Sequence, residues 1–391
     1  MTQAAHHVLD FSLVQGGPFN RMLERGKLLR APTGLVERRV IACIAVTLLP
    51  LVVLTAVSGT LVSGVAIPLV RDLDVTVKFL VALPLMIIAE PIVHSRVKET
   101  VQEFLDRDLV APRDEPRFEA IVASTMRLRN NAVVEVLLFV VALTGGYALW
   151  RSTGAIHDMP TWYSRHDGGS GLTAAGWWYA IVSQSVARFI MFRWYFRLFV
   201  WYVLTWRISR LRLRLDALHP DRAGGLAFLT HTVTAFSPVL VAQSSFVAAM
   251  IGNHIWHEGT KLPAFKFQIT GVFVFLTLQT IVPLLFFSMQ LVRARLATYY
   301  EMGRLAVRYT SAFRNKWLEP PRDDGLLGTA DLQSLADLAN SFEVVRSTRP
   351  MPFDLRAVLQ VVGVIALPLL PLALTMVPLD ELLRGVLKIV M

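Results

Sequence analysis

The sequence has little of the chemistry that marks a soluble enzyme. It contains one cysteine, Cys43, inside an apolar run, which excludes a disulfide framework and a cysteine-based metal site. Charged residues make up 17% of the chain and hydrophobic residues 54%, a balance too apolar for a soluble domain. No phosphate-binding loop and no nucleophile with a recognisable base occurs. The sequence therefore favours a membrane protein over an enzyme.

Seven apolar stretches dominate the 391 residues. Each is long enough for a helix to cross roughly 30 Å of hydrocarbon. The stretches cover residues 41–64, 76–95, 131–150, 176–199, 227–252, 267–292 and 357–378. They predict an all-α fold, a polytopic bundle of seven transmembrane helices in a transmembrane domain of residues 41–378. Prolines that can interrupt a helix lie in most of them, namely Pro50, Pro84, Pro91, Pro238, Pro283, Pro368 and Pro371.

Basic residues are distributed unevenly between these stretches. Counted from the N-terminus, alternate gaps hold 6, 7, 5 and 10 lysines or arginines, whereas each gap between them holds at most 2. Positive residues accumulate on the cytoplasmic side of membrane proteins. The pattern therefore predicts a cytoplasmic N-terminus and a C-terminus on the outer side. Contact with anionic lipid headgroups then accounts for the net charge of +10, and nucleic acid is not an expected partner.

The two ends of the chain are predicted to lie on the membrane surface. Residues 1–40 form a cytoplasmic segment in which Phe19, Met22 and Leu23 alternate with basic residues at helical spacing, the pattern of an interfacial helix. Residues 379–391 are amphipathic and too short to cross the bilayer, so we expect them on the outer surface, and a re-entrant course is the alternative.

The cytoplasmic insertions are long and helical in pattern. They cover residues 96–130, 200–226 and 293–356. The second and sixth spans are expected to continue into them as helices, to residues 110 and 317 respectively. Apolar residues from Leu332 to Val345 recur on one helical face, and Pro350 ends that run. The sequence thus predicts a cytoplasmic layer of helices.

Charged side chains inside the spans need partners. The fourth span carries Arg188, Arg193 and Arg197, and an arginine at mid-bilayer costs at least about 2.5 kcal/mol unless it is paired or hydrated. One polar layer is expected near the cytoplasmic ends of the spans, while Arg188 lies further from that side without an evident partner. The expected members of this layer are Glu90, Glu135, Arg193, Arg197 and His231. The layer is either a set of interhelical ion pairs or a hydrated path that attracts an anion.

Four histidines fall on the predicted outer side, and they are His157, His166, His254 and His257. His254 and His257 share a helical face at a spacing that suits two ligands of one metal ion. The alternative is that these imidazoles contact water at the membrane surface. No cofactor is predicted from the sequence, and a metal or haem group at the histidines stays an open alternative.

The loop before the fifth span has the most motif-like sequence, LHPDRAGGL. Its polar and glycine residues are His219, Asp221, Arg222, Gly224 and Gly225. Paired glycines permit a tight turn, and exposed amides at a helix start can hold a phosphate or a lipid headgroup with the help of Arg222. The alternative is a structural cap in which Asp221 accepts the amide hydrogen bonds itself.

The chain resembles a group of uncharacterised bacterial inner-membrane proteins in two stretches, HPDRAGGL and the closing pattern LPLLPLALTMVPLDELL. The resemblance covers these stretches and the general layout of the spans. It implies location in the bacterial inner membrane, with the C-terminus in the periplasm. It implies no activity and no functional residues.

Three function classes remain open. The leading hypothesis is a channel or transporter for a small anionic solute, with Arg188 and Arg193 lining the path and Glu90, Glu135 and His231 adjusting charge at its inner mouth. A homo-oligomer is compatible with such a pore. The second hypothesis is a membrane-bound metal or haem protein that uses the outer histidines. The third is a sensory or scaffolding protein whose amphipathic segments 94–110 and 330–349 dock a partner.

Overall fold

The computed structural model describes residues 11–29, 33–153, 160–164, 171–319 and 329–376, and within these ranges it is helical and contains no β-strand. The first half contains α2 (Pro18–Arg25), α3 (Val36–Thr47), α4 (Leu49–Val57), η1 (Leu69–Arg71), α5 (Leu73–Val77), η2 (Lys78–Ala82), α6 (Leu83–Asp106), η3 (Pro112–Asp114), α7 (Glu115–Arg129), α8 (Ala132–Thr153), α9 (Ala174–Trp178) and η4 (Tyr179–Ser183). The second half contains α10 (Gln184–Ile208), η5 (Ala227–Leu229), α11 (Thr230–Ala235), α12 (Ser237–Glu258), η6 (Leu262–Phe265), α13 (Lys266–Leu285), α14 (Ser288–Trp317), α15 (Ala330–Ser347), α16 (Leu355–Ala366), η7 (Leu367–Leu369) and α17 (Leu370–Leu374).

The described helices are compatible with a multi-pass membrane protein. Six of them are long and apolar enough to cross a bilayer, and these are Val36–Val57, Leu73–Asp106, Pro112–Gly145, Ser237–Glu258, Leu262–Leu285 and Leu355–Leu374. Between 11% and 56% of each apolar window is buried inside the molecule, so apolar surface remains to be covered by lipid. The fourth predicted span, α9 to α10, is one helical rod but is not among the six, because its arginines and aromatic residues lower its hydropathy.

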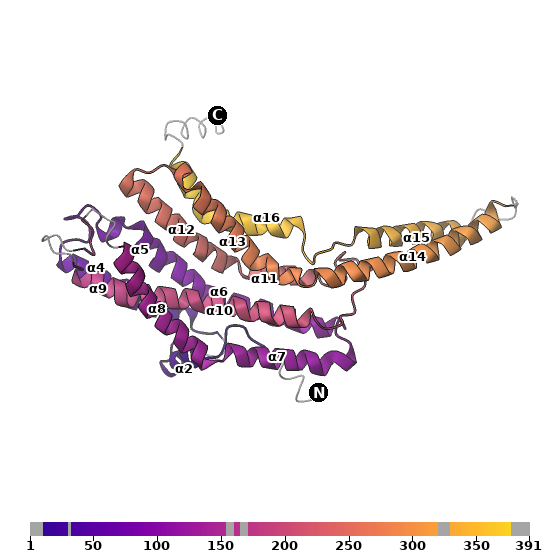
Figure 1. Ribbon diagram of the computed structural model, residues 1–391, viewed down its shortest axis with the longest axis horizontal. Helices are drawn as coiled ribbons and strands as arrows, with labels where there is room; N and C mark the ends of the chain where they lie inside the picture. Colours follow the sequence, from indigo (N-terminus) through magenta and orange to yellow (C-terminus); the bar gives the residue numbers. More distant parts are fainter. Residues whose placement is uncertain (1–10, 30–32, 154–159, 165–170, 320–328, 377–391) are drawn as a thin grey trace.

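The helices lie in an elongated bundle (Figure 1). In its middle, α6 and α10 run along the long axis. Helices α12, α13 and α16 lie on one side of them, and α7 and α8 on the other. Helices α14 and α15 pair as a hairpin that extends beyond the bundle at one end, here called the hairpin end, while α4, α5 and α9 form the opposite end.

The helices predicted beyond the spans are present. Helix α6 continues to Asp106, and α15 covers most of the predicted segment 330–349. On α15, Leu338 and Phe342 pack against Met302 and Ala217, so its apolar face holds the hairpin to the loop that follows α10. The sixth span differs from the prediction, because the helix is broken after Leu285, two residues beyond Pro283. Segment 379–391 lies outside the described residues.

The N-terminal segment is partly packed into the bundle, and the interfacial position of its helix stays a prediction. Its helix α2 is only 8 residues long, and the preceding residues Phe11, Leu13 and Val14 are 1%, 0% and 3% exposed within the main core. The ring of Phe19 packs edge-on against Phe189 of α10, with centroids 5.1 Å apart. Burial of these side chains draws the segment into the bundle, because apolar groups gain more from a packed core than from a surface. We call residues 11–20 the N-terminal plug.

Two prolines leave backbone carbonyls free to accept hydrogen bonds from side chains of α9 and α10. Pro50 and Pro283 have no amide hydrogen, so the carbonyls four residues earlier, of Val46 and Gln279, lose their helical donors. Trp178 Nε1 donates to the Val46 carbonyl at 3.1 Å, and the Tyr202 hydroxyl donates to the Gln279 carbonyl at 2.8 Å. The rod from α9 to α10 is thereby attached to the break between α3 and α4 at one end and to α13 at the other.

Candidate functional site

A buried charge cluster ties the middle of the bundle together. Glu90 of α6 accepts hydrogen bonds from two guanidinium groups, Arg39 of α3 and Arg197 of α10, the latter at 2.7 Å. The three residues are 6%, 6% and 4% exposed. Their partners must therefore come from protein, since water has little access. Sequence reasoning missed Arg39 because it lies just before the first predicted span.

The second pair of the cluster involves the N-terminal plug. Arg193 of α10 lies 3.2 Å from Glu135 of α8 and donates to Asn20 of the plug at 2.8 Å. The backbone amide of Phe19 donates to Glu135 at 3.1 Å, and the Phe19 ring stacks under the Arg193 guanidinium at 4.5 Å. Both predicted acids and both predicted arginines are thus brought together and fully engaged.

His231 is the member of the predicted layer that the structure does not bring there. It lies at the start of α11, is exposed, and is not among the contacts of Glu90, Glu135, Arg193 or Arg197. His231 therefore takes no part in the charge cluster.

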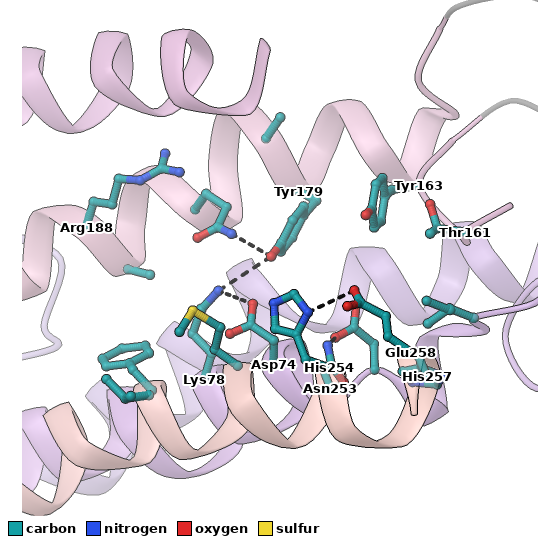
Figure 2. A pocket seen from close by; sticks show the side chains of 18 of the residues that line it. Asp74, Lys78, Thr161, Tyr163, Tyr179, Arg188, Asn253, His254, His257 and Glu258 are labelled. Atoms are coloured by element: carbon teal, nitrogen blue, oxygen red, sulfur yellow. Dashed lines mark hydrogen bonds and ion pairs between the residues drawn. The ribbon is translucent and has the colours of Figure 1, made fainter. Parts of the chain in front are cut away.

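A cavity of about 610 Å³ lies between α5, η2, η4, α10 and α12, towards the end opposite the hairpin (Figure 2). It is lined by Ile67, Asp72, Asp74, Lys78, Thr161, Tyr163, Tyr179, Ala180, Gln184, Ala187, Arg188, Met191, Phe246, Val247, Met250, Asn253, His254, His257 and Glu258. Its size falls within the range of small-molecule sites. We call this end of the bundle the cavity end.

Two π-helical turns face each other across the cavity. Lys78 begins the turn η2 and Tyr179 begins the turn η4. Figure 2 shows the Lys78 ammonium between Asp74, to which it donates at 2.6 Å, and the Tyr179 hydroxyl at 3.5 Å. Gln184 donates to the same hydroxyl at 2.5 Å. Single π-helical turns occur frequently at functional sites because they redirect side chains out of the helical register.

Arg188 is the cavity residue with unused hydrogen-bonding capacity. It projects from α10, and within the described residues its Nη1 atom is buried without a hydrogen-bond partner and no ion pair is formed by its guanidinium. The Arg188 residue as a whole is only partly buried, and its unpartnered buried nitrogen is suited to donate to an acceptor on a ligand. The sequence predicted the lack of a partner but not the cavity.

Asp72 holds the walls of the cavity together. Its carboxylate caps α5 through the Val75 amide at 3.2 Å and accepts from Trp162 Nε1 at 3.0 Å and Asn253 Nδ2 at 2.8 Å. These donors come from α5, from the segment after α8, and from α12. All three are neutral, so the negative charge of Asp72 is hydrogen-bonded but not cancelled.

The outer histidines do not assemble a metal site in the described part of the chain. His254 Nδ1 lies 2.8 Å from Glu258 of the same helix, and His257 Nε2 donates to the Arg71 carbonyl at 3.0 Å. No group of three or more potential metal ligands occurs within the described ranges. His157 and His166 lie outside them. The histidine pair therefore braces the rim of the cavity.

The LHPDRAGGL loop is built as a cap. Asp221 accepts hydrogen bonds from the amides of Ala223 at 2.8 Å, Gly225 at 3.2 Å and Ala227 at 3.1 Å. Gly224 and Gly225 adopt φ of +63° and +92°, which wraps the backbone around the carboxylate. The amides predicted to hold a phosphate or headgroup are thus occupied by the protein's own acid.

The flanking residues of the loop have structural roles as well. His219 Nδ1 lies 2.9 Å from Asp221, and the exposed Arg222 accepts a hydrogen bond at its carbonyl from the Arg349 amide at 2.8 Å. Burial would raise the pKa of Asp221, but the hydrogen bonds from the Ala223, Ala227 and Gly225 amides outweigh it and lower that pKa below its usual value.

Comparisons with models of protein families, with curated proteins and with solved structures find no match for this chain. The candidate site therefore rests on its own geometry. Lys78 is the residue that sequence reasoning could have found, because it is the only lysine inside the seven predicted spans. Nothing in the sequence marks its partner Tyr179 as a site residue.

Replacing Glu90 by Gln is expected to destabilise the protein by about 3–5 kcal/mol, because Arg39 and Arg197 lose their shared counter-charge while remaining buried. The matched control is Glu99→Gln on the same helix, whose partner Arg96 lies 3.4 Å away with both side chains more than half exposed. Its effect should lie within about 1 kcal/mol of zero. Thermal unfolding of the proteins in nanodiscs measures both. Equal shifts in the two variants would contradict a buried cluster.

Asp221→Asn is expected to lower stability by about 1 kcal/mol at pH 7, since the cap loses its charge-assisted hydrogen bonds. Because the folded-state pKa of Asp221 is lowered, the stabilisation is fully present above the unfolded value near 3.9 and is lost as the pH falls through the folded value. The difference between wild type and variant should therefore shrink below about pH 4. A difference that stays constant down to pH 2 argues against this cap.

Proposed function

We propose that the chain is a polytopic transport protein of the bacterial inner membrane that moves a small anionic solute, with the cavity as its binding site. The observation that carries the proposal is Arg188, a cation with an unused donor in a cavity at the middle of a helical rod. A cation at this depth attracts anions and excludes cations.

Seven spans and the orientation are part of the proposal. Helices α9 to α10 supply the span that is not among the six apolar helices, and the arginines of this span are paired or line the cavity. The basic gaps between spans then fall at the hairpin end, and α7, α14 and α15 form the cytoplasmic layer. The cavity end faces the periplasm.

The close packing between the cavity and the hairpin end favours a transporter over an open pore. A void of about 20 Å³ lies between the N-terminal plug, α8 and α10, lined by Arg193, Glu135 and Val14 among others. That is room for about one water molecule. In the proposed orientation the cavity faces outward, and the N-terminal plug and the Arg193–Glu135 pair lie on its inner side, so we expect transport to require that plug and pair to move.

The orientation can be tested with single cysteines. In a Cys43→Ser background, Lys261→Cys between α12 and α13 and Arg308→Cys on α14 introduce exposed thiols at opposite ends of the bundle. A membrane-impermeant maleimide is expected to label position 261 in intact cells and position 308 only after the membrane is permeabilised. Labelling of both positions in intact cells, or the reverse pattern, refutes the proposed topology.

Anion flux tests the function itself. Proteoliposomes containing the wild type should take up at least one of chloride, phosphate and benzoate faster than empty liposomes. Arg188→Gln should slow that uptake by about tenfold or more, the effect of losing one hydrogen bond to a charged group. Arg96→Gln, on the exposed surface of α6, is the matched control and should leave uptake unchanged. Uptake that is equal in wild type and Arg188→Gln contradicts the proposal.

A further inference from the structure

We propose that the cavity selects a monovalent organic anion with a compact apolar body over inorganic anions and over dianions. This inference names the ligand of the site just described and rests on the proposed function. It is carried by three features of the cavity, namely a single available cation, an apolar wall beside it, and uncancelled acids near the rim.

The first feature limits the charge that the cavity accepts. Its two cationic side chains are Arg188 and Lys78, and Lys78 is already paired with Asp74 at 2.6 Å. Of these two side chains, Arg188 is thus the one with a nitrogen atom that has no hydrogen-bond partner. One available cation matches one negative charge on the ligand.

The second feature is the surface beside Arg188. Ala187 and Met191 of α10, and Phe246, Val247 and Met250 of α12, line the same cavity as Arg188. An inorganic anion that entered would lose its hydration and gain few contacts from these side chains. An organic body gains roughly 0.8 kcal/mol for each CH₂ group that it buries there. The cavity volume of about 610 Å³ also exceeds what a single small ion fills.

The third feature disfavours a second negative charge. Asp72 lines the same cavity with only neutral hydrogen-bond donors, and Glu258 faces it next to His254 (Figure 2). A dianion held at Arg188 would place its other charge closer to these carboxylates, in surroundings where like charges repel strongly. A neutral apolar body avoids that repulsion. Stacked rings of Tyr163 and Tyr179, 6.3 Å apart, offer it a flat surface.

Calorimetric titration of the full-length protein in nanodiscs of neutral lipid tests the selection. The probes are benzoate, its neutral analogue benzamide, the dianion phthalate, chloride and phosphate. Benzoate is expected to bind at least about tenfold more tightly than each of the others, which corresponds to 1.4 kcal/mol. Arg188→Gln should remove the preference of benzoate over benzamide and leave benzamide binding unchanged.

Met191→Gln keeps the side-chain size and replaces an apolar contact by an amide. It should weaken benzoate by about fivefold with little effect on chloride, because only the organic body contacts this wall. This variant also tests the inference if Arg188→Gln does not fold, and Arg96→Gln serves as the surface control. Equal binding of benzoate and benzamide, or tighter binding of chloride, phosphate or phthalate, overturns the inference.

The outcomes separate this inference from the proposed function. If benzoate binds through Arg188 but no flux in proteoliposomes depends on Arg188, the ligand class stands and the transport proposal fails. If flux of chloride or phosphate depends on Arg188 while benzoate neither binds nor competes, transport stands and the ligand class fails.

Discussion

The rest of the bundle depends on one carboxylate that serves two guanidinium groups. Glu90 joins α6 to α3 through Arg39 and to α10 through Arg197, and the neighbouring Arg193–Glu135 pair adds α8 and the N-terminal plug. Burying several charges is tolerable only when each is paired, because desolvation of an ion costs several kcal/mol. Helices that carry these groups therefore cannot separate independently. The cluster thereby fixes the positions of α3, α6, α8, α10 and the N-terminal plug relative to one another.

Much of the helical fold could be predicted from the sequence, because hydropathy and helical rise are local properties. The same rise placed Glu90, Glu135, Arg193 and Arg197 at one depth, and their side chains do meet. His231 was expected in the same layer but is exposed at the start of α11, since counting residues does not determine how each helix is placed and rotated in the packing. The N-terminal plug could not be predicted either, because residues 11–17 have no helical period and their burial depends on a gap between distant helices.

The candidate site, too, could be predicted only in part from the sequence. The lack of a partner for Arg188 was evident from the scarcity of acids in the spans, but the cavity that it lines forms between α5, η2, η4, α10 and α12, elements far apart in the sequence, which no local pattern encodes. The π-helical turns that bring Lys78 and Tyr179 together also have no signature in composition. For LHPDRAGGL, the sequence allowed an anion loop or a cap, and three amide hydrogen bonds to Asp221 make it a cap.

The carbonyls exposed by Pro50 and Pro283 have a mechanical consequence. Each is bound by one side chain of the α9–α10 rod, Trp178 or Tyr202, and not by its own helix. Releasing either contact costs a single hydrogen bond, of about 0.5–1.5 kcal/mol, and breaks no main-chain turn. At these two carbonyls the rod is therefore held by side-chain hydrogen bonds, and neither bond belongs to the main-chain hydrogen bonding of α4 or α13. Because Arg188, Arg193 and Arg197 lie on one helix, any displacement of α10 would move the cavity wall and the charge cluster together.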